Sequence, residues 1–179
     1  MAAVLHINVT VHKRDNRLSL TPNCMMNSIW LNPFVLFLLL ISQSQTKSVC
    51  DKGWMDFGRH CYLFVSRIST FSDGMVYCSK VSPGAKLLEI DNPEEEKWIA
   101  MQLQLRGFPQ SWLGVSDIFQ EKVFVRLSDG RRPMYTKWDK GEPNNHGNNE
   151  DCGVIRTNGK WNDYPCNSKV KFICKSPIA

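Results

Sequence analysis

The chain has 179 residues, enough for one ordinary domain with a short appendage. With 42% hydrophobic and 22% charged residues, a packed core is expected and disorder throughout the chain is excluded. The formal net charge is only +5, and apart from Lys13-Arg14 and Arg131-Arg132 the basic residues are scattered, so nucleic-acid binding is not expected.

Residues 1–44 are predicted to be an N-terminal extension followed by a secretory signal segment. Their apolar stretch, residues 29–41, is shorter than the roughly 20 residues that a membrane-spanning helix needs, and Asn32-Pro33 interrupts it. Met25 and Met26 stand directly ahead of this stretch, so either is a candidate for the true start.

Small polar residues at Ser42 and Ser44 suit signal peptidase, so the mature chain is expected to begin near Gln45 and to be secreted. The alternative is a type II membrane protein, in which the basic segment near the N-terminus would be a cytoplasmic tail. A membrane anchor is not expected, because the apolar run is too short.

Six of the seven cysteines lie between residues 50 and 174, and only Cys24 lies upstream. An even set in so compact a segment predicts three disulfides and an oxidising compartment. No CxxC pair is present, which argues against a zinc ribbon or a thioredoxin-like motif. Spacing alone does not choose among the pairings that six cysteines allow.

The mature chain opens with aromatic residues on either side of Gly58, flanked by Cys50 and Cys61, which predicts a short hairpin closed by a disulfide. A helix is predicted over 71–81, because apolar residues recur there at helical spacing.

The signals for a second helix are clearer. Asp91 or Asn92 can cap it, Pro93 suits its first position, and the three glutamates that follow favour its positive N-terminal end. Gly107 ends it. Its expected apolar face consists of Trp98, Met101 and Leu105.

Four short strand-like runs follow, at residues 112–115, 123–127, 153–157 and 170–175. Two helices followed by short strands predict an α+β domain with an antiparallel sheet. The polar segment between Trp138 and Cys152 lacks apolar periodicity, and a loop of that length in a compact domain is more often functional than idle.

That loop and residues 161–163 are rich in carboxylates and carboxamides, whose oxygens are the ligands that calcium prefers. The candidate ligands are Glu142, Asn144, Glu150, Asn162 and Asp163. No EF-hand pattern is present, so a site here would be built differently. On composition alone, a plain polar turn explains the loop equally well.

The sequence resembles a C-type lectin domain over nearly all of residues 50–174. The residues that carry the likeness are the six cysteines, Trp112-Leu113-Gly114, Glu142-Pro143-Asn144 and Trp161-Asn162-Asp163. Together these motifs are highly specific, and the Glu-Pro-Asn order is that of the mannose-binding members.

The resemblance implies a domain at residues 45–179 with the long form of the α+β C-type lectin-like fold. That form has two helices, small antiparallel sheets, a long calcium-binding loop region and three disulfides. The implied pairs are Cys50–Cys61, Cys78–Cys174 and Cys152–Cys166. A cis peptide bond between Glu142 and Pro143 is also implied.

The resemblance further implies one Ca²⁺ at the five candidate ligands, with two sugar hydroxyls entering its coordination shell. Each hydroxyl would donate to Glu142 or Glu150 and accept from Asn144 or Asn162. His146 matches a position where some relatives contact the sugar, and an ordinary solvent-exposed loop histidine is the alternative.

A second, auxiliary Ca²⁺ is implied by residues that match the family's acidic ligands. These are Asp117, Glu121, Glu150, Asp151 and residue 145. The residue there is Asn145 rather than the family's Asp, which lowers the negative charge and the expected affinity. Trp161 is expected to support the core and the loop rather than to stack on a sugar.

The expected function is therefore calcium-dependent binding of mannose, N-acetylglucosamine or fucose-type sugars, without enzymatic activity. Expected partners are glycans on glycoproteins and microbial surface polysaccharides, met in innate defence, and oligomers would supply avidity. The alternative is a structural or mineral-associated protein, because residues 131–138 and 161–166 resemble the perlucin-like proteins of molluscan shell.

Overall fold

The computed structural model describes residues 49–178. The predictions for residues 1–44, which include the signal segment and the start methionine, fall outside this described range.

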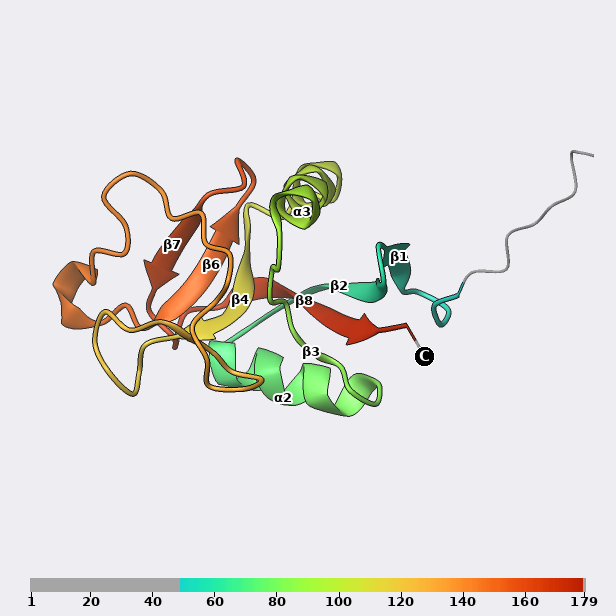
Figure 1. Ribbon diagram of the computed structural model, residues 1–179, viewed down its shortest axis with the longest axis horizontal. Helices are drawn as coiled ribbons and strands as arrows, with labels where there is room; N and C mark the ends of the chain where they lie inside the picture. The colour runs from blue at the N-terminus through green and yellow to red at the C-terminus, as the bar shows by residue number, and fades with distance from the viewer. Residues whose placement is uncertain (1–48, 179) are drawn as a thin grey trace, which may run out of the picture. The chain divides into compact units, whose positions relative to one another are not determined.

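Within residues 49–178, eight strands form one sheet, whose main path runs β1-β2-β8-β4-β6-β7 (Figure 1). The bounds are β1 Met55–Phe57, β2 His60–Ser69, β3 Lys86–Leu87, β4 Gln110–Ser116, β5 Val125–Arg126, β6 Cys152–Arg156, β7 Trp161–Tyr164 and β8 Val170–Pro177. The pairs are antiparallel except β4 with β8, which is parallel. The predicted α+β class is confirmed, although the expected small sheets are joined into one.

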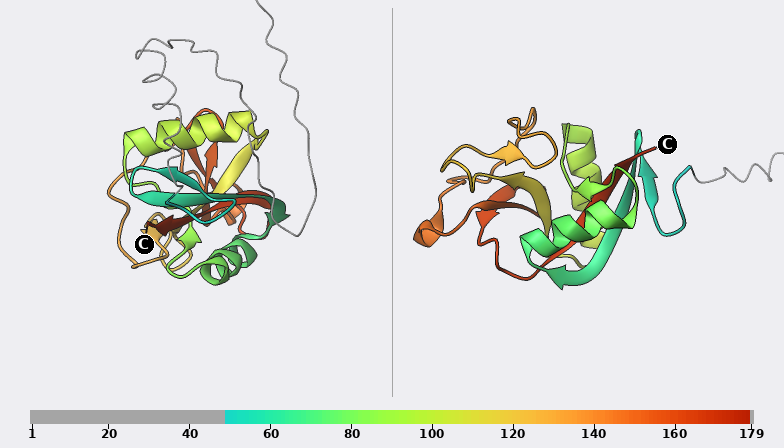
Figure 2. Two further views of the ribbon diagram at one scale, coloured as in Figure 1. Left: turned by 90° about the vertical axis from the view of Figure 1, so that its right-hand side faces the viewer. Right: turned by 90° about the horizontal axis from the view of Figure 1, so that it is seen from below.

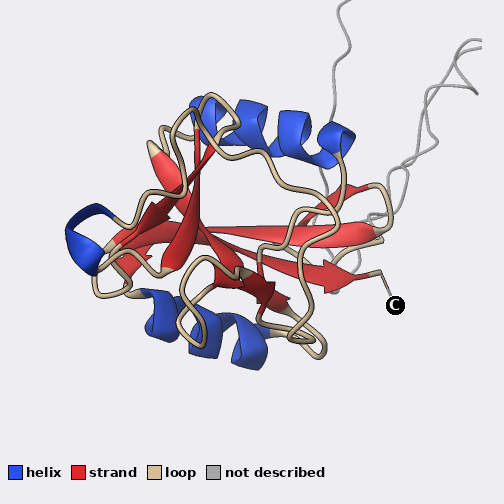
Figure 3. Cartoon of the chain, turned by 60° about the vertical axis from the view of Figure 1, so that its left-hand side comes forward, coloured by secondary structure: helices blue, strands red, loops and turns tan. Residues whose placement is uncertain are grey.

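Two helices cover opposite faces of the sheet: α2 (Phe71–Val81) and α3 (Pro93–Leu105) (Figures 1 and 3). The Thr70 side chain caps α2 by accepting the N–H of Asp73, and the Asn92 side chain caps α3 in the same way. Both helices begin at their predicted first residues, Phe71 and Pro93, where the caps act locally.

The predicted apolar face of α3 is confirmed for Trp98, which packs against the core, and is wrong for Met101 and Leu105. Met101 is 46% exposed and Leu105 is 72% exposed, whereas Ile99 and Leu103 are fully buried. The buried face could not be predicted from apolar spacing, because acidic side chains lie on it together with the apolar ones.

Those acidic side chains are Glu95 and Glu96, each of which faces a cation. Glu95 Oε1 accepts the hydroxyl of Tyr62 at 2.7 Å and lies 2.7 Å from Lys175 Nζ. Glu96 Oε2 lies 2.5 Å from Lys137 Nζ. The glutamates therefore hold α3 to other segments, in addition to favouring the positive end of the helix.

Two hydrophobic clusters fill the spaces between the sheet and the helices. Neighbouring residues of the central strands alternate between the clusters, as in Trp112 and Leu113, Val154 and Ile155, and Phe172 and Ile173. The first residue of each pair lies on the α2 side and the second on the α3 side, so one sheet supports both helices.

The three implied disulfides are all present, including the Cys50–Cys61 bridge of the N-terminal hairpin. Cys78–Cys174 connects α2 to β8 across a sequence separation of 96 residues. Closing a loop of that size stabilises a fold by about 4–5 kcal/mol in the chain-entropy description. Cys152–Cys166 joins β6 to the turn after β7, next to the candidate ligands.

Candidate functional site

The long polar loop lies at the end of the domain opposite β1 and the C-terminus (Figures 1 and 2). It begins where Trp138 forms a bridge with Trp161, the first residue of β7. The backbone N–H of Trp161 donates to the Lys137 carbonyl, and Trp161 is completely buried, as expected for a support of the core and the loop. The short helix η1 (His146–Asn148) lies within this loop.

Asp163 is the anchor of the loop. Its Oδ1 accepts the backbone N–H of Asn144 at 3.2 Å, and its Oδ2 accepts that of Asn145 at 2.6 Å. Asp163 lies on β7 and is 1% exposed. A rigid strand therefore positions two residues of an otherwise irregular segment.

Glu150 closes the other side of the loop. Its Oε2 accepts the N–H of His146 at 3.0 Å, and its own N–H donates to Asn145 Oδ1 at 3.0 Å. These contacts fold the loop back on itself between Asn145 and Glu150.

Two of the predicted ligands have buried oxygens with no hydrogen-bond partner among the described residues: Glu142 Oε2 and Asn162 Oδ1. Buried polar atoms are normally paired, so each of these needs an explanation. The Asn162 amide donates to the Asp163 carbonyl, which leaves its oxygen free. Carboxylate and amide oxygens of this kind suit a hard cation such as Ca²⁺, and the residues present therefore fit that ion.

The electrostatics of the site favour a positive charge among these groups. Burial raises the pKa of the Glu142 carboxyl, and the neighbouring Asp163 carboxylate raises it further. The charge of Glu150 acts in the same direction. A cation placed among these groups would reverse that shift.

The Glu142–Pro143 peptide bond is cis, as the resemblance implies. In the described part of the chain, His, Cys, Asp and Glu side chains alone do not make a metal-binding group of three or more. The two asparagines are therefore necessary members of the predicted ligand set.

The residues predicted for the auxiliary ion lie beside the same loop. Asp117 Oδ1 is buried and has no partner among residues 49–178, while Oδ2 accepts the N–H of Lys122 at 2.8 Å. Burial raises the pKa of Asp117, as do the charges of Glu121 and Asp151. The Asn145 amide donates to Glu121 Oε2 at 2.5 Å. This hydrogen bond uses a carboxylate oxygen that would otherwise be available to an auxiliary ion.

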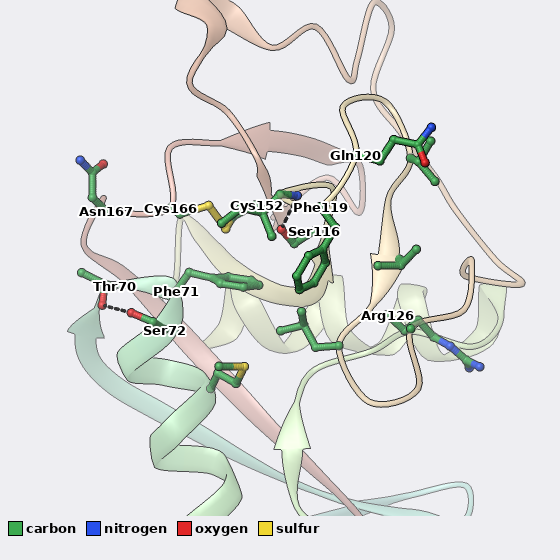
Figure 4. A pocket seen from close by; sticks show the side chains of 16 residues that line it. Thr70, Phe71, Ser72, Ser116, Phe119, Gln120, Arg126, Cys152, Cys166 and Asn167 are labelled. Carbon is green, nitrogen blue, oxygen red and sulfur yellow. Dashed lines mark hydrogen bonds between the residues drawn. A yellow bond between two sulfur atoms is a disulfide. The ribbon is translucent and has the colours of Figure 1, made fainter.

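An apolar pocket of about 800 Å³ lies between the start of α2 and residues 116–130, apart from the five primary ligands. Figure 4 shows the rings of Phe71 and Phe119 in it, with the Cys152–Cys166 bridge close by. Its one charged lining residue, Arg126, is ion-paired with Asp129. Sequence reasoning did not find this pocket, because its lining comes from several distant segments.

The chain belongs to the C-type lectin domain family. The family model "Lectin C-type domain" matches residues 67–176. Family and fold are those of non-enzymatic, carbohydrate-binding proteins. No helix among residues 49–178 has the length and apolar character needed to cross a membrane.

Individual proteins agree with this assignment. A lectin from Pleurodeles waltl is 32% identical over 81% of this chain and 92% of its own length. The low affinity immunoglobulin epsilon Fc receptor of Mus musculus is 33% identical over 76% of this chain, but the match spans only 40% of that receptor. The carbohydrate-recognition domain of the mouse scavenger receptor C-type lectin has 30% identity and a TM-score of 0.67, covering 73% of this chain and 99% of that domain.

Proposed function

We propose that this protein binds mannose, N-acetylglucosamine or fucose-type sugars through a Ca²⁺ held by Glu142, Asn144, Glu150, Asn162 and Asp163. The observation that carries the proposal is the pair of buried, unpartnered oxygens on Glu142 and Asn162. Both belong to the predicted ligand set, and a cation would satisfy both at once.

The roles of the side chains follow from their hydrogen-bonding capacity. When bound, Ca²⁺ would supply open coordination positions for two neighbouring equatorial hydroxyls of the sugar. Glu142 and Glu150 only accept, so they would take the hydroxyl protons, whereas Asn144 and Asn162 would donate to the hydroxyl oxygens. Asp163 would hold the ion and the loop together.

The order of acid and amide supports the mannose-type preference. Galactose binders of the family carry Gln-Pro-Asp where this chain has Glu142-Pro143-Asn144. Exchanging acid and amide exchanges acceptor and donor, so a sugar with the other hydroxyl geometry leaves polar groups unpaired.

Two further residues are proposed with smaller roles. His146 is an exposed residue of the loop, where it can contact the sugar ring or remain in solvent. Asp117, Glu121, Asn145, Asp151 and Glu150 would hold the auxiliary Ca²⁺. The Asn145–Glu121 hydrogen bond would have to break first, so we expect weaker binding there than at the primary site.

Retention on mannose-agarose tests the proposal. The protein should be retained in calcium and eluted by EDTA or by free mannose, while galactose at the same concentration should not elute it. Because a single shallow site binds at about millimolar affinity, a densely substituted resin is needed. A protein that binds calcium but passes through the resin would overturn the sugar assignment.

The wider setting is also a proposal. Three disulfides suit a secreted protein, and residues 45–179 would be its lectin domain. Recognition of glycoproteins and microbial polysaccharides in innate defence would follow from the sugar preference, with oligomers for avidity.

The fold gives little support to the alternative of a structural or mineral-associated protein. In the stretch that suggested it, residues 131–138, Lys137 pairs with Glu96 and Trp138 packs on Trp161. These side chains serve the interior of the domain. The side chains of this stretch that remain exposed, and could contact an acidic matrix, are Arg131, Arg132 and Met134.

A further inference from the structure

A second hollow, of about 520 Å³, is lined by parts of β2, α2 and the turn before β8. Three cations that are far apart in the sequence line it: Arg67, Lys80 and Lys169. We call this hollow the cationic groove. Asp73 is its one acidic lining residue, so the groove carries a net charge of about +2.

The cations of the groove are largely free to meet a ligand. Lys169 Nζ lies 3.8 Å from Asp73 Oδ2, and these side chains are 56% and 66% exposed, so the pair contributes little. Among the described residues, neither Arg67 nor Lys80 forms an ion pair, and both are exposed.

Arg67 lies in a bulge of β2 and is exposed to solvent. Val65 pairs with Phe172 and Ser69 with Val170, so residues 66–68 of β2 lie opposite the single residue 171 of β8. A bulge of this kind redirects side chains away from the regular pleat.

The side chain of Arg67 is also held in position. Its guanidinium lies over the ring of Tyr77, 5.1 Å from the centroid. Tyr77 packs edge-on against Phe172, with ring centroids 5.4 Å apart. The cation is therefore supported by the core and loses less freedom when it binds an anion.

The shape and the chemistry of the groove favour one class of partner. The cations line a hollow, which an extended chain can enter and a flat bilayer cannot. The Arg67 guanidinium covers Tyr77, so this ring is not open for a nucleic-acid base to stack on it. We propose that the cationic groove binds the anionic groups of a sulfated polysaccharide, independently of calcium and of the proposed sugar site.

Heparin is the probe for this proposal, and binding is measured in EDTA so that the calcium site contributes nothing. The full chain should bind at about 150 mM NaCl, near physiological ionic strength. The triple variant R67Q/K80Q/K169Q should bind at least about tenfold more weakly, and the dependence of log affinity on log salt should fall by about 2–3 as counterion release is lost.

The matched control is K52Q/R59Q/K97Q, which also removes one arginine and two lysines, all exposed and outside the groove. It should retain most of the heparin affinity. Equal losses in the two variants would show that bulk charge is responsible and would overturn the proposal, as would absence of heparin binding by the wild type.

Phosphatidylserine vesicles distinguish a membrane from a polysaccharide. Binding to vesicles through the same three cations, with no response to heparin, would also contradict the proposal. The single variants K80Q and K169Q are the control for misfolding of the triple variant. Both side chains are exposed, so each substitution should leave the fold intact. Retention on mannose-agarose should be unchanged in all of these variants, so failure here and failure of the calcium site are distinguishable.

Discussion

The Asp163 carboxylate accepts the backbone N–H of Asn144 on one oxygen and that of Asn145 on the other. A predicted calcium ligand is therefore also the residue that positions the loop carrying other ligands. Under the proposed assignment, loop shape and calcium binding would both depend on this buried side chain.

Asp163→Asn should lower calcium affinity by roughly 100-fold, since a charged ligand is lost and an amide nitrogen cannot accept a backbone N–H. Calcium titration followed by tryptophan fluorescence measures the effect, because Trp161 adjoins the site. The control is Asp139→Asn, the same change at a loop carboxylate outside the ligand set, which should bind calcium like the wild type. Equal calcium affinity in the two variants would contradict the assigned role of Asp163.

The double variant Glu142→Gln with Asn144→Asp should move the sugar preference from mannose towards galactose. It exchanges an acceptor and a donor at the two positions while the ligand count and net charge stay the same. Competition of free sugars against resin-bound protein measures the ratio of the two affinities. A variant that still prefers mannose by the wild-type ratio would show that other residues set the specificity.

Acid should weaken calcium binding and release the sugar. Burial and the neighbouring Asp163 raise the pKa of Glu142, so in the ion-free site this carboxyl binds a proton at higher pH than an ordinary glutamate does. Protons compete with Ca²⁺ for the ionised form, and calcium affinity should therefore decrease as pH falls from 7.4 to 5. Calcium titrations at several pH values test this, and constant affinity over that range would count against it.

Lys175→Met should destabilise the fold by about 3–5 kcal/mol, because it leaves Glu95 as a buried carboxylate without its cation. Urea unfolding with the disulfides intact measures the loss of free energy. Lys171→Met is the control on the same strand, since Lys171 is only partly buried and forms no ion pair among the described residues. Similar losses in both variants would show that the buried pair has no special importance.

How far the sequence predicts this fold depends on how local each interaction is. Both helices have the expected bounds at their N-termini, because Thr70 and Asn92 cap them within one turn. The strands were predicted less well. The run at residues 123–127 is reduced to Val125–Arg126, and β3 was not predicted, because a two-residue strand exists only through its partner.

For the candidate site, the sequence supplies candidate ligands and the fold supplies their arrangement. Glu142, Asn144 and Glu150 were predicted from residue type and motif, and they remain predictions as ligands. That Asp163 holds the loop by two backbone N–H groups could not be predicted, because those contacts join residues 18 and 19 positions apart.

The sequence by itself determined the helix starts and the membership of the C-type lectin family and supplied the candidate oxygen ligands, since these depend on short motifs. Only the tertiary structure decided which face of α3 is buried, why Glu95 is tolerated there, and that Arg67, Lys80 and Lys169 share one groove. Burial, ion pairing and charge clustering are properties of segments that are distant in the chain and adjacent in space. Their energies exist only once the sheet has brought those segments together.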